Sequence, residues 1–478
     1  MNAEKDLTKG PLWKQIILFS LPLMFSNILQ ALFNMSDIAV VGKFAGNTAL
    51  GAVGSTTILV SLFTGFLIGL GNGVNVVVAR FIGEKNHKKI TESVLAALVT
   101  CSTIGIILLF IGLFCSRFFL ELINTKDDLI DGATLYLKIY FFGMPAMAIY
   151  NYGNAIFSAS GNTKKPIVYL LIAGIINVLL NLFFVIVCHL DVAGVAIASA
   201  ASQYVSAILI VISLTRLKTS CKLCIKDNKF NFEYCKMVLK LGIPSGFQNC
   251  IFAIANLFIQ KGVNSFDSIM VEGNSAATNF DALIYDVMAA CYMACSSFIG
   301  QNFGARNKKR VINSYLIAML YAFLFGALFG GLLVIFDRQL LSIFTSSEEV
   351  IDAGVKRIQI MGYSYAFSAL MDNTIAASRG LGKTIVPTII VISGSCIFRI
   401  AWIYTIFAHY HTIKSLYLLY FFSWMITGIF ELIYFIYAYK KTFKNDQIWL
   451  NIRGEFRRIK INISKQRVRK KKASFRSI

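Results

Sequence analysis

The first long apolar segment of the chain, Gln15–Asn34, reads QIILFSLPLMFSNILQALFN and contains no charged residue. A helix of about 20 such residues crosses the hydrocarbon core of a bilayer. Further charge-free segments lie at residues 93–115, 166–190 and 311–336. A large soluble helical protein would instead show an apolar stripe on one side of each helix. The sequence therefore predicts a polytopic membrane protein.

The composition supports this prediction. The chain has 478 residues, of which 56% are hydrophobic and 15% are charged, whereas soluble domains average about 25% charged residues. So few charged side chains cannot cover a water-exposed surface of this size, so much of the surface must face lipid. The first apolar segment has no small-residue cleavage site and many similar segments follow it, so we interpret it as a span and not as a removable signal peptide.

Apolar segments separated by short polar connections predict an all-α protein with twelve transmembrane helices. The expected spans are residues 12–34, 46–72, 91–115, 132–158, 166–188, 192–214, 234–260, 274–300, 311–335, 348–378, 384–408 and 414–439. Most of the 46 Lys and Arg residues lie at the N-terminus, in the connections after even-numbered spans and in the tail. Because cytoplasmic loops carry the excess of Lys and Arg, both termini are expected in the cytoplasm.

The C-terminal tail, residues 441–478, contributes much of the formal net charge of +22. A basic segment that follows a membrane span is attracted to anionic lipid on the cytoplasmic side. Apolar residues at helical spacing, Trp449, Ile452, Phe456 and Ile459, predict an amphipathic helix at the membrane surface. We favour this interpretation over nucleic-acid binding by the tail, and we expect no nucleic-acid partner.

Three motifs recur in the second part of the chain at an offset of 221 or 222 residues. They are Leu21-Pro22-x-x-Phe25-x-Asn27 with Ile243-Pro244-x-x-Phe247-x-Asn249, GEKNHKK at 83–89 with GARNKKR at 304–310, and GNTKKP at 161–166 with GKTIVP at 382–387. Each repeat holds six spans, an even number, so the two repeats are parallel and related by an axis along the membrane normal. We expect an N-terminal six-helix lobe (1–215), a cytoplasmic loop (216–233), a C-terminal six-helix lobe (234–440) and the basic tail (441–478).

The sequence resembles the multidrug and toxic compound extrusion (MATE) family from about Gly10 to Lys440. The resemblance rests on Pro22 and on NMSDIAVVG at 34–42, ALGAVG at 49–54, GQNFGAR at 300–306 and RGLGKT at 379–384. It implies a V-shaped exporter of two lobes in the bacterial plasma membrane. It also implies efflux of cationic, amphipathic compounds, driven by Na+ or H+ as coupling ion and with no other cofactor. We expect a monomer.

Acidic residues inside the spans are candidates for ion coupling, because a charge at membrane depth costs about 2.5–3.5 kcal/mol on insertion scales. Asp37 matches the family's N-lobe aspartate, and Asp372 resembles a position linked to cation binding. Asp281 and Asp286 lie five residues apart, about 140° round a helix, so they cannot share a face. The structural alternative is that one of these acids pairs with Arg399. Glu431 faces either a cavity, a neighbouring helix or the interface.

Two family positions differ in this sequence. Many members carry a glutamate eight residues after the proline of span seven, where this chain has Phe252. Others carry an aspartate in span five, where Asn177 and Asn181 stand. Because an amide cannot take up a proton, the sequence leaves the choice of coupling ion open.

Polar residues in the spans are expected to line the substrate cavity or to form interhelical hydrogen bonds. The candidates for the cavity are Asn34, Asn151, Asn177, Asn181, Gln203, Gln248, Asn249 and Arg399. One alternative function is a flippase for a lipid-linked glycan, which would need basic residues in the cavity to hold a pyrophosphate. A membrane-embedded enzyme would need a catalytic constellation at membrane depth, but all four histidines fall at span ends or in loops. We therefore expect a transporter without enzymatic activity.

Overall fold

The computed structural model describes residues 6–224 and 230–474, with only the backbone described at Asn47 and from 445 onward. Every regular element of these residues is a helix, as the sequence predicted. The chain divides into two units, residues 1–432 and 433–478. The α16 helix (Ile413–Ser474) runs without a break through the predicted lobe boundary at residue 440. The side chains of the predicted amphipathic tail helix lie outside the described residues.

The first half of the chain forms seven α-helices, two of which continue into a π-helical turn. They are α1 (Leu12–Val40), η1 (Val41–Ala45), α2 (Gly46–Gly83), α3 (His87–Leu122), α4 (Asp127–Phe142), α5 (Met144–Ala159), α6 (Lys164–Leu182), η2 (Phe183–Val187) and α7 (Asp191–Thr215). The predicted fourth span is broken at Gly143 into α4 and α5, which are bent by 46°. Pro145 stands in the first turn of α5, where the missing N–H of proline costs nothing.

The second half repeats this arrangement. Its elements are α8 (Phe232–Val263), α9 (Ser268–Gly304), α10 (Lys308–Ile335), α11 (Asp337–Leu341), α12 (Glu348–Gly380), α13 (Ile385–Val391), η3 (Ile392–Ile397), α14 (Phe398–Trp402), η4 (Ile403–Phe407), α15 (Ala408–Tyr410) and the start of α16. The predicted eleventh span is therefore a succession of α- and π-helical segments. π-Helical turns inside α-helices often occur at functional sites.

Ten helices of the described residues are long and apolar enough to cross a membrane, and the bent α4–α5 pair adds an eleventh candidate. The predicted span 348–378 corresponds to α12, a helix of 33 residues. It is not among the ten, and it carries charged residues along its length, including Arg357 and Asp372 in its interior. All twelve predicted spans thus fall on long helical segments, and the chain is a multi-pass membrane protein.

The loops of the repeated motifs share their geometry. Asn86 accepts a hydrogen bond from the Lys89 N–H at 3.1 Å and caps α3, and Asn307 accepts one from the Arg310 N–H at 3.1 Å and caps α10. The residues before these caps both have positive φ, 52° at Lys85 and 57° at Arg306. An asparagine N-cap satisfies one of the free N–H groups at the start of a helix. The motif at 83–89 and 304–310 therefore repeats because in each half it ends one helix and starts the next.

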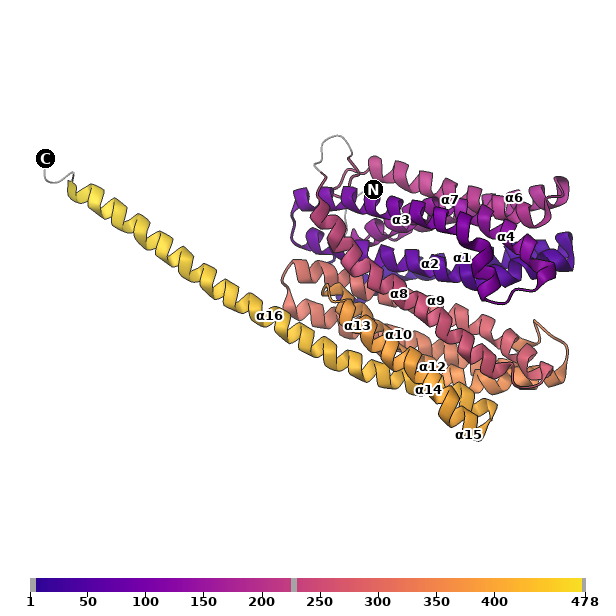
Figure 1. Cartoon of the computed structure of the whole chain (residues 1–478). Helices are drawn as coiled ribbons and strands as arrows, with labels where there is room; N and C mark the ends of the chain where they lie inside the picture. Colours follow the sequence, from indigo (N-terminus) through magenta and orange to yellow (C-terminus); the bar gives the residue numbers. More distant parts are fainter. Residues whose placement is uncertain (1–5, 225–229, 475–478) are drawn as a thin grey trace. The chain divides into compact units, whose positions relative to one another are not determined.

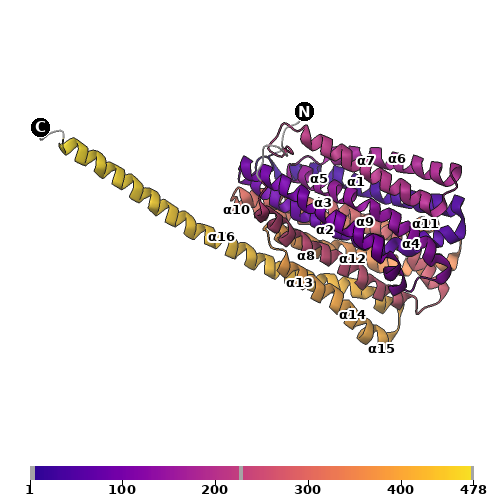
Figure 2. The same cartoon turned by 45° about the horizontal axis from the view of Figure 1, so that its top comes forward.

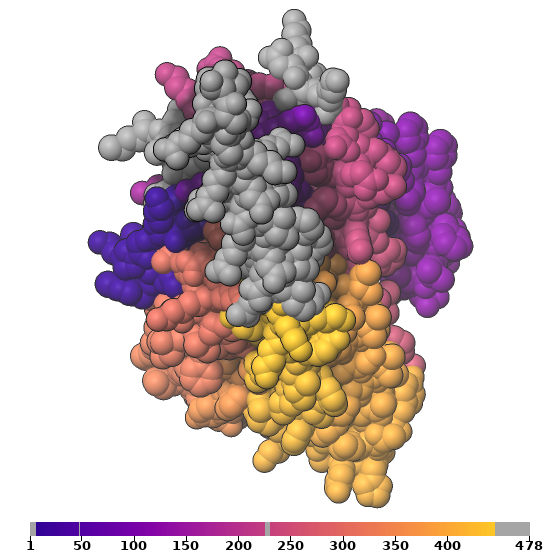
Figure 3. All heavy atoms as spheres, turned by 90° about the vertical axis from the view of Figure 1, so that its left-hand side faces the viewer, coloured from indigo at the N-terminus to yellow at the C-terminus, as the bar shows by residue number. Residues whose placement is uncertain are grey.

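Within residues 1–432, α1–α7 lie together on one side and α8–α15 on the other (Figures 1 and 2). The two halves meet through α1, α2, α8 and α9, which contact one another in pairs. In the space-filling view the indigo-to-magenta half lies above the salmon-to-orange half, and the two are in contact (Figure 3). A two-lobe arrangement is therefore present, as the internal repeat predicted.

The α2 and α8 helices approach each other at glycines. A Cβ atom on Gly69 would lie 2.3 Å from the Gly246 nitrogen, and one on Gly73 would lie 2.6 Å from the Gly242 nitrogen. Both helices thus carry glycines four residues apart at their contact, the spacing by which small residues let helices pack closely in membranes. The contact holds the two halves together along these helices.

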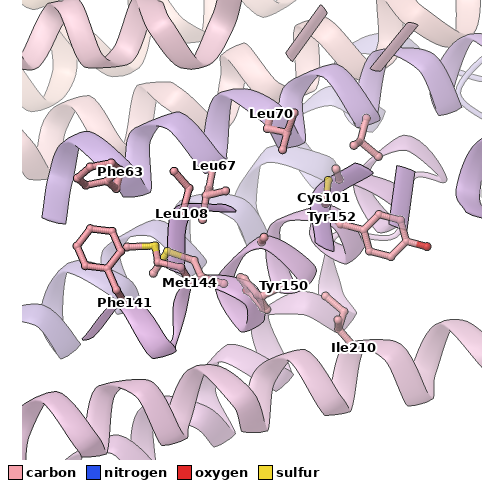
Figure 4. Packing of buried hydrophobic residues seen from close by; sticks show 14 of the residues in the cluster. Phe63, Leu67, Leu70, Cys101, Leu108, Phe141, Met144, Tyr150, Tyr152 and Ile210 are labelled. Atoms are coloured by element: carbon pink, nitrogen blue, oxygen red, sulfur yellow. The ribbon is translucent and has the colours of Figure 1, made fainter. Parts of the chain in front are cut away.

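The core of the first half is packed with large apolar side chains. Phe63, Leu67 and Leu70 of α2 lie near Leu108 of α3 and Phe141 of α4 (Figure 4). The rings of Phe63 and Phe141 meet edge to face with centroids 4.9 Å apart. This packing fixes the helices that carry the polar residues of the site described next.

Candidate functional site

A cavity of about 240 Å³ lies inside the first half of the chain. Helices α1, α2, α4, α5, α6 and α7 all contribute to its wall. Its polar lining consists of Gln30, Asn34, Asp37, Thr57, Ser61, Thr64, Asn177, Ser199, Ser202, Gln203 and Ser206. Its other residues are aliphatic or aromatic, and among the described lining residues the single charged one is Asp37. The cavity thus offers one carboxylate within a largely uncharged wall.

The Asp37 carboxylate is held by side chains from two other helices. Asn181 of α6 donates a short hydrogen bond to Oδ1, and Ser199 of α7 donates one of 3.1 Å to Oδ2. Asn177, one turn before Asn181, donates to the Ser199 hydroxyl at 3.4 Å. Residues four apart on a helix share a face, so α6 presents both amides to Asp37. Such donors stabilise an ionised carboxylate away from bulk water.

Aromatic rings form another part of the cavity wall. Phe33 comes from α1, and Tyr136 and Tyr140 come from α4. The two tyrosine rings are stacked, with centroids 5.8 Å apart, because residues four apart on a helix lie one above the other. The face of an aromatic ring attracts an organic cation. The cavity therefore combines a carboxylate with surfaces that suit an apolar or cationic molecule.

Four of the predicted cavity residues lie at this site. Asn34, Asn177 and Gln203 line the cavity, and Asn181 reaches it through its bond to Asp37. The sequence did not point to Ser199, Tyr136 or Tyr140, because serine and tyrosine are common along the spans. Only the folded arrangement of α4, α6 and α7 selects these three residues.

The other predicted cavity residues make interhelical or intrahelical contacts. Asn151 donates to the Met147 carbonyl at 3.0 Å, within its own helix. Asn249 of α8 donates to the Gly65 carbonyl of α2 at 2.8 Å. Gln248 accepts a hydrogen bond of 2.9 Å from Arg379 of α12. None of these three is among the residues that line the described cavity, so their part in substrate binding stays a prediction.

Asp281 forms a buried ion pair with Arg357. The Arg357 Nε atom donates to the Asp281 carboxylate at 2.8 Å, and both residues are buried, with 8% of Asp281 and 5% of Arg357 exposed. Arg357 also donates to Asn274 at 2.8 Å and lies over the Tyr417 ring at 5.1 Å from its centroid. The charge of Arg357 is therefore balanced and hydrogen-bonded within the folded structure. Asp281 is thus placed in a structural pair, and its part in ion coupling stays a prediction.

The partner suggested by the sequence for a buried acid, Arg399, has other contacts. Its Nε donates to Ser423 at 3.1 Å and its Nη1 to Asn256 at 3.5 Å, and it lies over the Tyr420 ring at 4.7 Å from the centroid. Among the described ion pairs, the buried one joins Asp281 to Arg357. From sequence alone, Arg357 would be expected near water, because it lies close to the start of the predicted span 348–378. Its spacing from Val350, Gly354 and Met361, which are buried on the same face of α12, was a signal that it points inward.

Asp372 and Asp286 lie apart from the cavity of Asp37. Asp372 of α12 is 9% exposed and its Oδ2 atom has no hydrogen-bond partner among the described residues. Asp286 of α9 is half-buried, and its backbone carbonyl accepts a bond of 2.9 Å from Asn27 of α1. The acids of the second half therefore stand in three different environments.

Comparison with known proteins agrees with this arrangement. The sequence profile of the MatE family matches the chain twice, over residues 22–183 and 244–405. The chain belongs to the MatE family. Each matched segment lies within one structural half of this MatE protein, so the family's repeat occurs once in each half.

Relatives and solved structures of the MatE family extend over most of the chain. The chain is 27% identical over 372 residues to the probable multidrug resistance protein YpnP of Bacillus subtilis. This alignment covers 76% of the chain and 81% of the relative. It is 24% identical over 387 residues to the probable multidrug resistance protein NorM of Thermotoga maritima, with 79% and 82% covered. A solved structure described as the outward-facing conformation of a multidrug resistance MATE family transporter has a TM-score of 0.86 at 21% identity. That match covers 93% of this chain and 100% of the other. The chain is therefore a membrane transporter of the MatE family and not an enzyme.

Proposed function

We propose that this protein is a cation-coupled antiporter that exports amphipathic organic cations by alternating access. The observation that carries the proposal is the cavity around Asp37, with its single carboxylate and its aromatic and aliphatic wall. An organic cation placed there gains attraction from the carboxylate and from the rings of Phe33, Tyr136 and Tyr140. The related proteins named as multidrug resistance proteins support export of such compounds.

Asp37 is the group through which we propose that ion and substrate compete. Its carboxylate binds the coupling ion (Na+ or H+) or the organic cation. The two do not bind together, because Asp37 is the single negatively charged residue in the described lining of the cavity. Entry of the coupling ion from the outside then releases the substrate. Lysines and arginines are absent from the described lining of this cavity, which favours a cation over the pyrophosphate of a lipid-linked glycan.

The test is transport in proteoliposomes that contain the purified protein. A fluorescent organic cation serves as substrate, and Na+ and H+ gradients are imposed separately. We expect the dye to move against the flow of one of the two ions, and not to move when neither gradient is imposed. Equal dye movement in the presence and absence of both gradients would refute ion coupling.

The cytoplasmic position of both termini and the plasma-membrane location are part of this proposal, on the basis of the Lys and Arg distribution. Anionic lipid is the proposed partner of the basic tail, and a monomer is the proposed state.

A further inference from the structure

The carboxyl group of Glu431, in the α16 helix, is enclosed by protein. Glu431 is 0% exposed, and neither Oε1 nor Oε2 has a hydrogen-bond partner among the described residues. The alternative that it snorkels to the membrane interface is therefore wrong. An ionised carboxylate without compensating partners is very costly in an apolar environment. The group is thus stable in this conformation only if its charge is neutralised.

The surroundings of Glu431 come from α12 and η3. A Cβ atom on Gly428 would lie 3.2 Å from the Met371 nitrogen of α12, and the Thr427 hydroxyl lies 3.0 Å from that of Ser395 in η3. Glu431 follows Gly428 by three residues and Thr427 by four, so it projects from the same face of α16. Its side chain is therefore directed at the same two elements.

Two charged residues of α12 face this region. Asp372 and Arg379 lie seven residues apart, which is about two turns and places them on one face. Each of the two is within electrostatic range of Glu431. Asp372 also interacts with Arg399 of α14 and with Tyr285 and Tyr292 of α9.

The hydrogen bonding of these two groups is incomplete. The Oδ2 atom of Asp372 and the Nε atom of Arg379 lack hydrogen-bond partners among the described residues. The Arg379 Nη2 atom donates to Gln248 at 2.9 Å, which fixes the guanidinium between α8 and α12. The region is thus an enclosed group of charges with unused donors and acceptors.

The balance of charge indicates which group is neutral. If both acids were ionised, Glu431 and Asp372 would share the charge of Arg379, while Arg399 acts electrostatically on Asp372. One proton on Glu431 leaves a single carboxylate, that of Asp372, to balance the charges of Arg379 and Arg399. Two nearby carboxylates that share a site favour this kind of single protonation.

We propose that Glu431, Asp372 and Arg379 form an enclosed proton-binding site in the second half of the chain, with Glu431 as the residue that holds the proton. The site is separate from the Asp37 cavity, and it goes beyond the proposed function because it concerns proton binding by the protein at rest. When α12 and α16 move apart and water enters, the Glu431 O–H bond breaks and the proton passes to water.

The experiment is infrared spectroscopy of the purified full-length protein in lipid vesicles. A protonated carboxyl has a C=O stretching band that a carboxylate lacks. The wild-type protein at neutral pH is compared with Glu431→Gln and with Glu121→Gln, a control at an exposed glutamate of α3 that pairs with Arg117. We expect the band of one protonated carboxyl to be lost in Glu431→Gln and kept in the control.

Further variants separate the alternatives. Glu431→Asp keeps a carboxyl in place and is expected to retain a shifted band, which distinguishes loss of the proton site from loss of the fold. Asp37→Asn is expected to leave the Glu431 band unchanged. The proposal is overturned if Glu431→Gln keeps the wild-type band, or if the band disappears in Asp372→Asn and persists in Glu431→Gln. None of these readings requires transport, so the proton site and the proposed antiport can fail independently.

Discussion

The Ser297 hydroxyl of α9 donates a hydrogen bond of 3.1 Å to the amide oxygen of Asn75 in α2, and the two residues are 222 positions apart. That separation equals the offset of the first repeated motif. The bond therefore joins closely corresponding positions of the two halves, where α2 and α9 face each other. Both side chains are fully buried, and Asn75 also donates to the Ala155 carbonyl of α5 at 3.2 Å.

Replacing Asn75 or Ser297 should weaken the contact between the halves. Asn75→Ala leaves the Ser297 hydroxyl and the Ala155 carbonyl without a side-chain partner, so we expect it to lower the free energy of unfolding by about 1–3 kcal/mol. Ser297→Ala should lower it by less. A double-mutant cycle, measured by thermal unfolding in detergent, should give a coupling of about 0.6 kcal/mol, the average for such bonds in membranes. Strictly additive effects of the two substitutions would show that the bond contributes nothing.

Close packing of α2 against α8 should not tolerate a methyl group at Gly69. Its Cβ would lie 2.3 Å from the Gly246 backbone, and overpacking of this kind costs about 1–3 kcal/mol. Gly54 on the same helix has no atom within 4 Å of the position of its Cβ, so Gly54→Ala is the matched control. We expect Gly69→Ala to lower the unfolding temperature and Gly54→Ala to leave it unchanged or raise it. Equal effects of the two variants would contradict the close α2–α8 contact.

The repeated loops show why much of the fold was predictable. The motifs that recur at an offset of 221 hold the residues that local geometry demands, such as the capping Asn86 and Asn307. Span length and hydropathy are likewise local properties of the sequence. The break of span four at Gly143 has a local signal in Pro145, since a proline inside a span favours a bend. The continuous helix across residue 440 depends on helical propensity over a longer stretch, for which no single residue is a signal.

The Asp281–Arg357 pair should respond asymmetrically to substitution. Removing one member, as in Asp281→Ala or Arg357→Ala, leaves an uncompensated buried charge and should cost about 3–5 kcal/mol of stability. The double variant Asp281→Leu/Arg357→Met removes both charges and should be more stable than either single variant. Thermal unfolding of the four proteins checks this order. A double variant less stable than both single ones would show that the pair contributes more than mutual neutralisation.

The candidate site was predictable only in part. Asp37, Asn34, Asn177, Asn181 and Gln203 are polar residues within apolar spans, and such residues are rare enough to be noticed. Arg357 lies near the end of its predicted span, where an arginine usually reaches water, so its burial follows only from the partner that α9 supplies. Which acid has a partner and which has none is a property of the tertiary structure.

The N-terminal segment is attached to the second half through Arg310. The guanidinium donates to the carbonyls of Leu7 at 3.1 Å, Gly10 at 2.7 Å and Lys9 at 2.7 Å, and to the Gln15 side chain at 2.9 Å. A lysine has the charge but not the planar fork of donors, so we expect Arg310→Lys to release the segment. Limited proteolysis should then cut near residue 10 faster than in the wild type. Lys309→Arg provides a control at the neighbouring position, and unchanged cleavage of Arg310→Lys would contradict this attachment.

Asp37 is the residue on which the proposed antiport depends. Interactions with a charged group contribute about 1.5–3 kcal/mol, so its loss should slow gradient-driven transport by about 10–100-fold. Asn181→Ala removes one donor to the carboxylate but keeps its charge, and should reduce transport less than Asp37→Asn. A ranking in which Asn181→Ala is the more damaging change would mean that the amide and not the acid carries the function.

The most direct measurement is dye transport by proteoliposomes under imposed Na+ or H+ gradients, with wild type, Asp37→Asn and the control Asp131→Asn. Asp131 is an exposed acid of α4 that pairs with Arg117. We predict gradient-driven dye transport in the wild type and in Asp131→Asn, and loss of that transport in Asp37→Asn with intact folding. Undiminished gradient-driven transport in Asp37→Asn would contradict the proposed role of Asp37 in antiport.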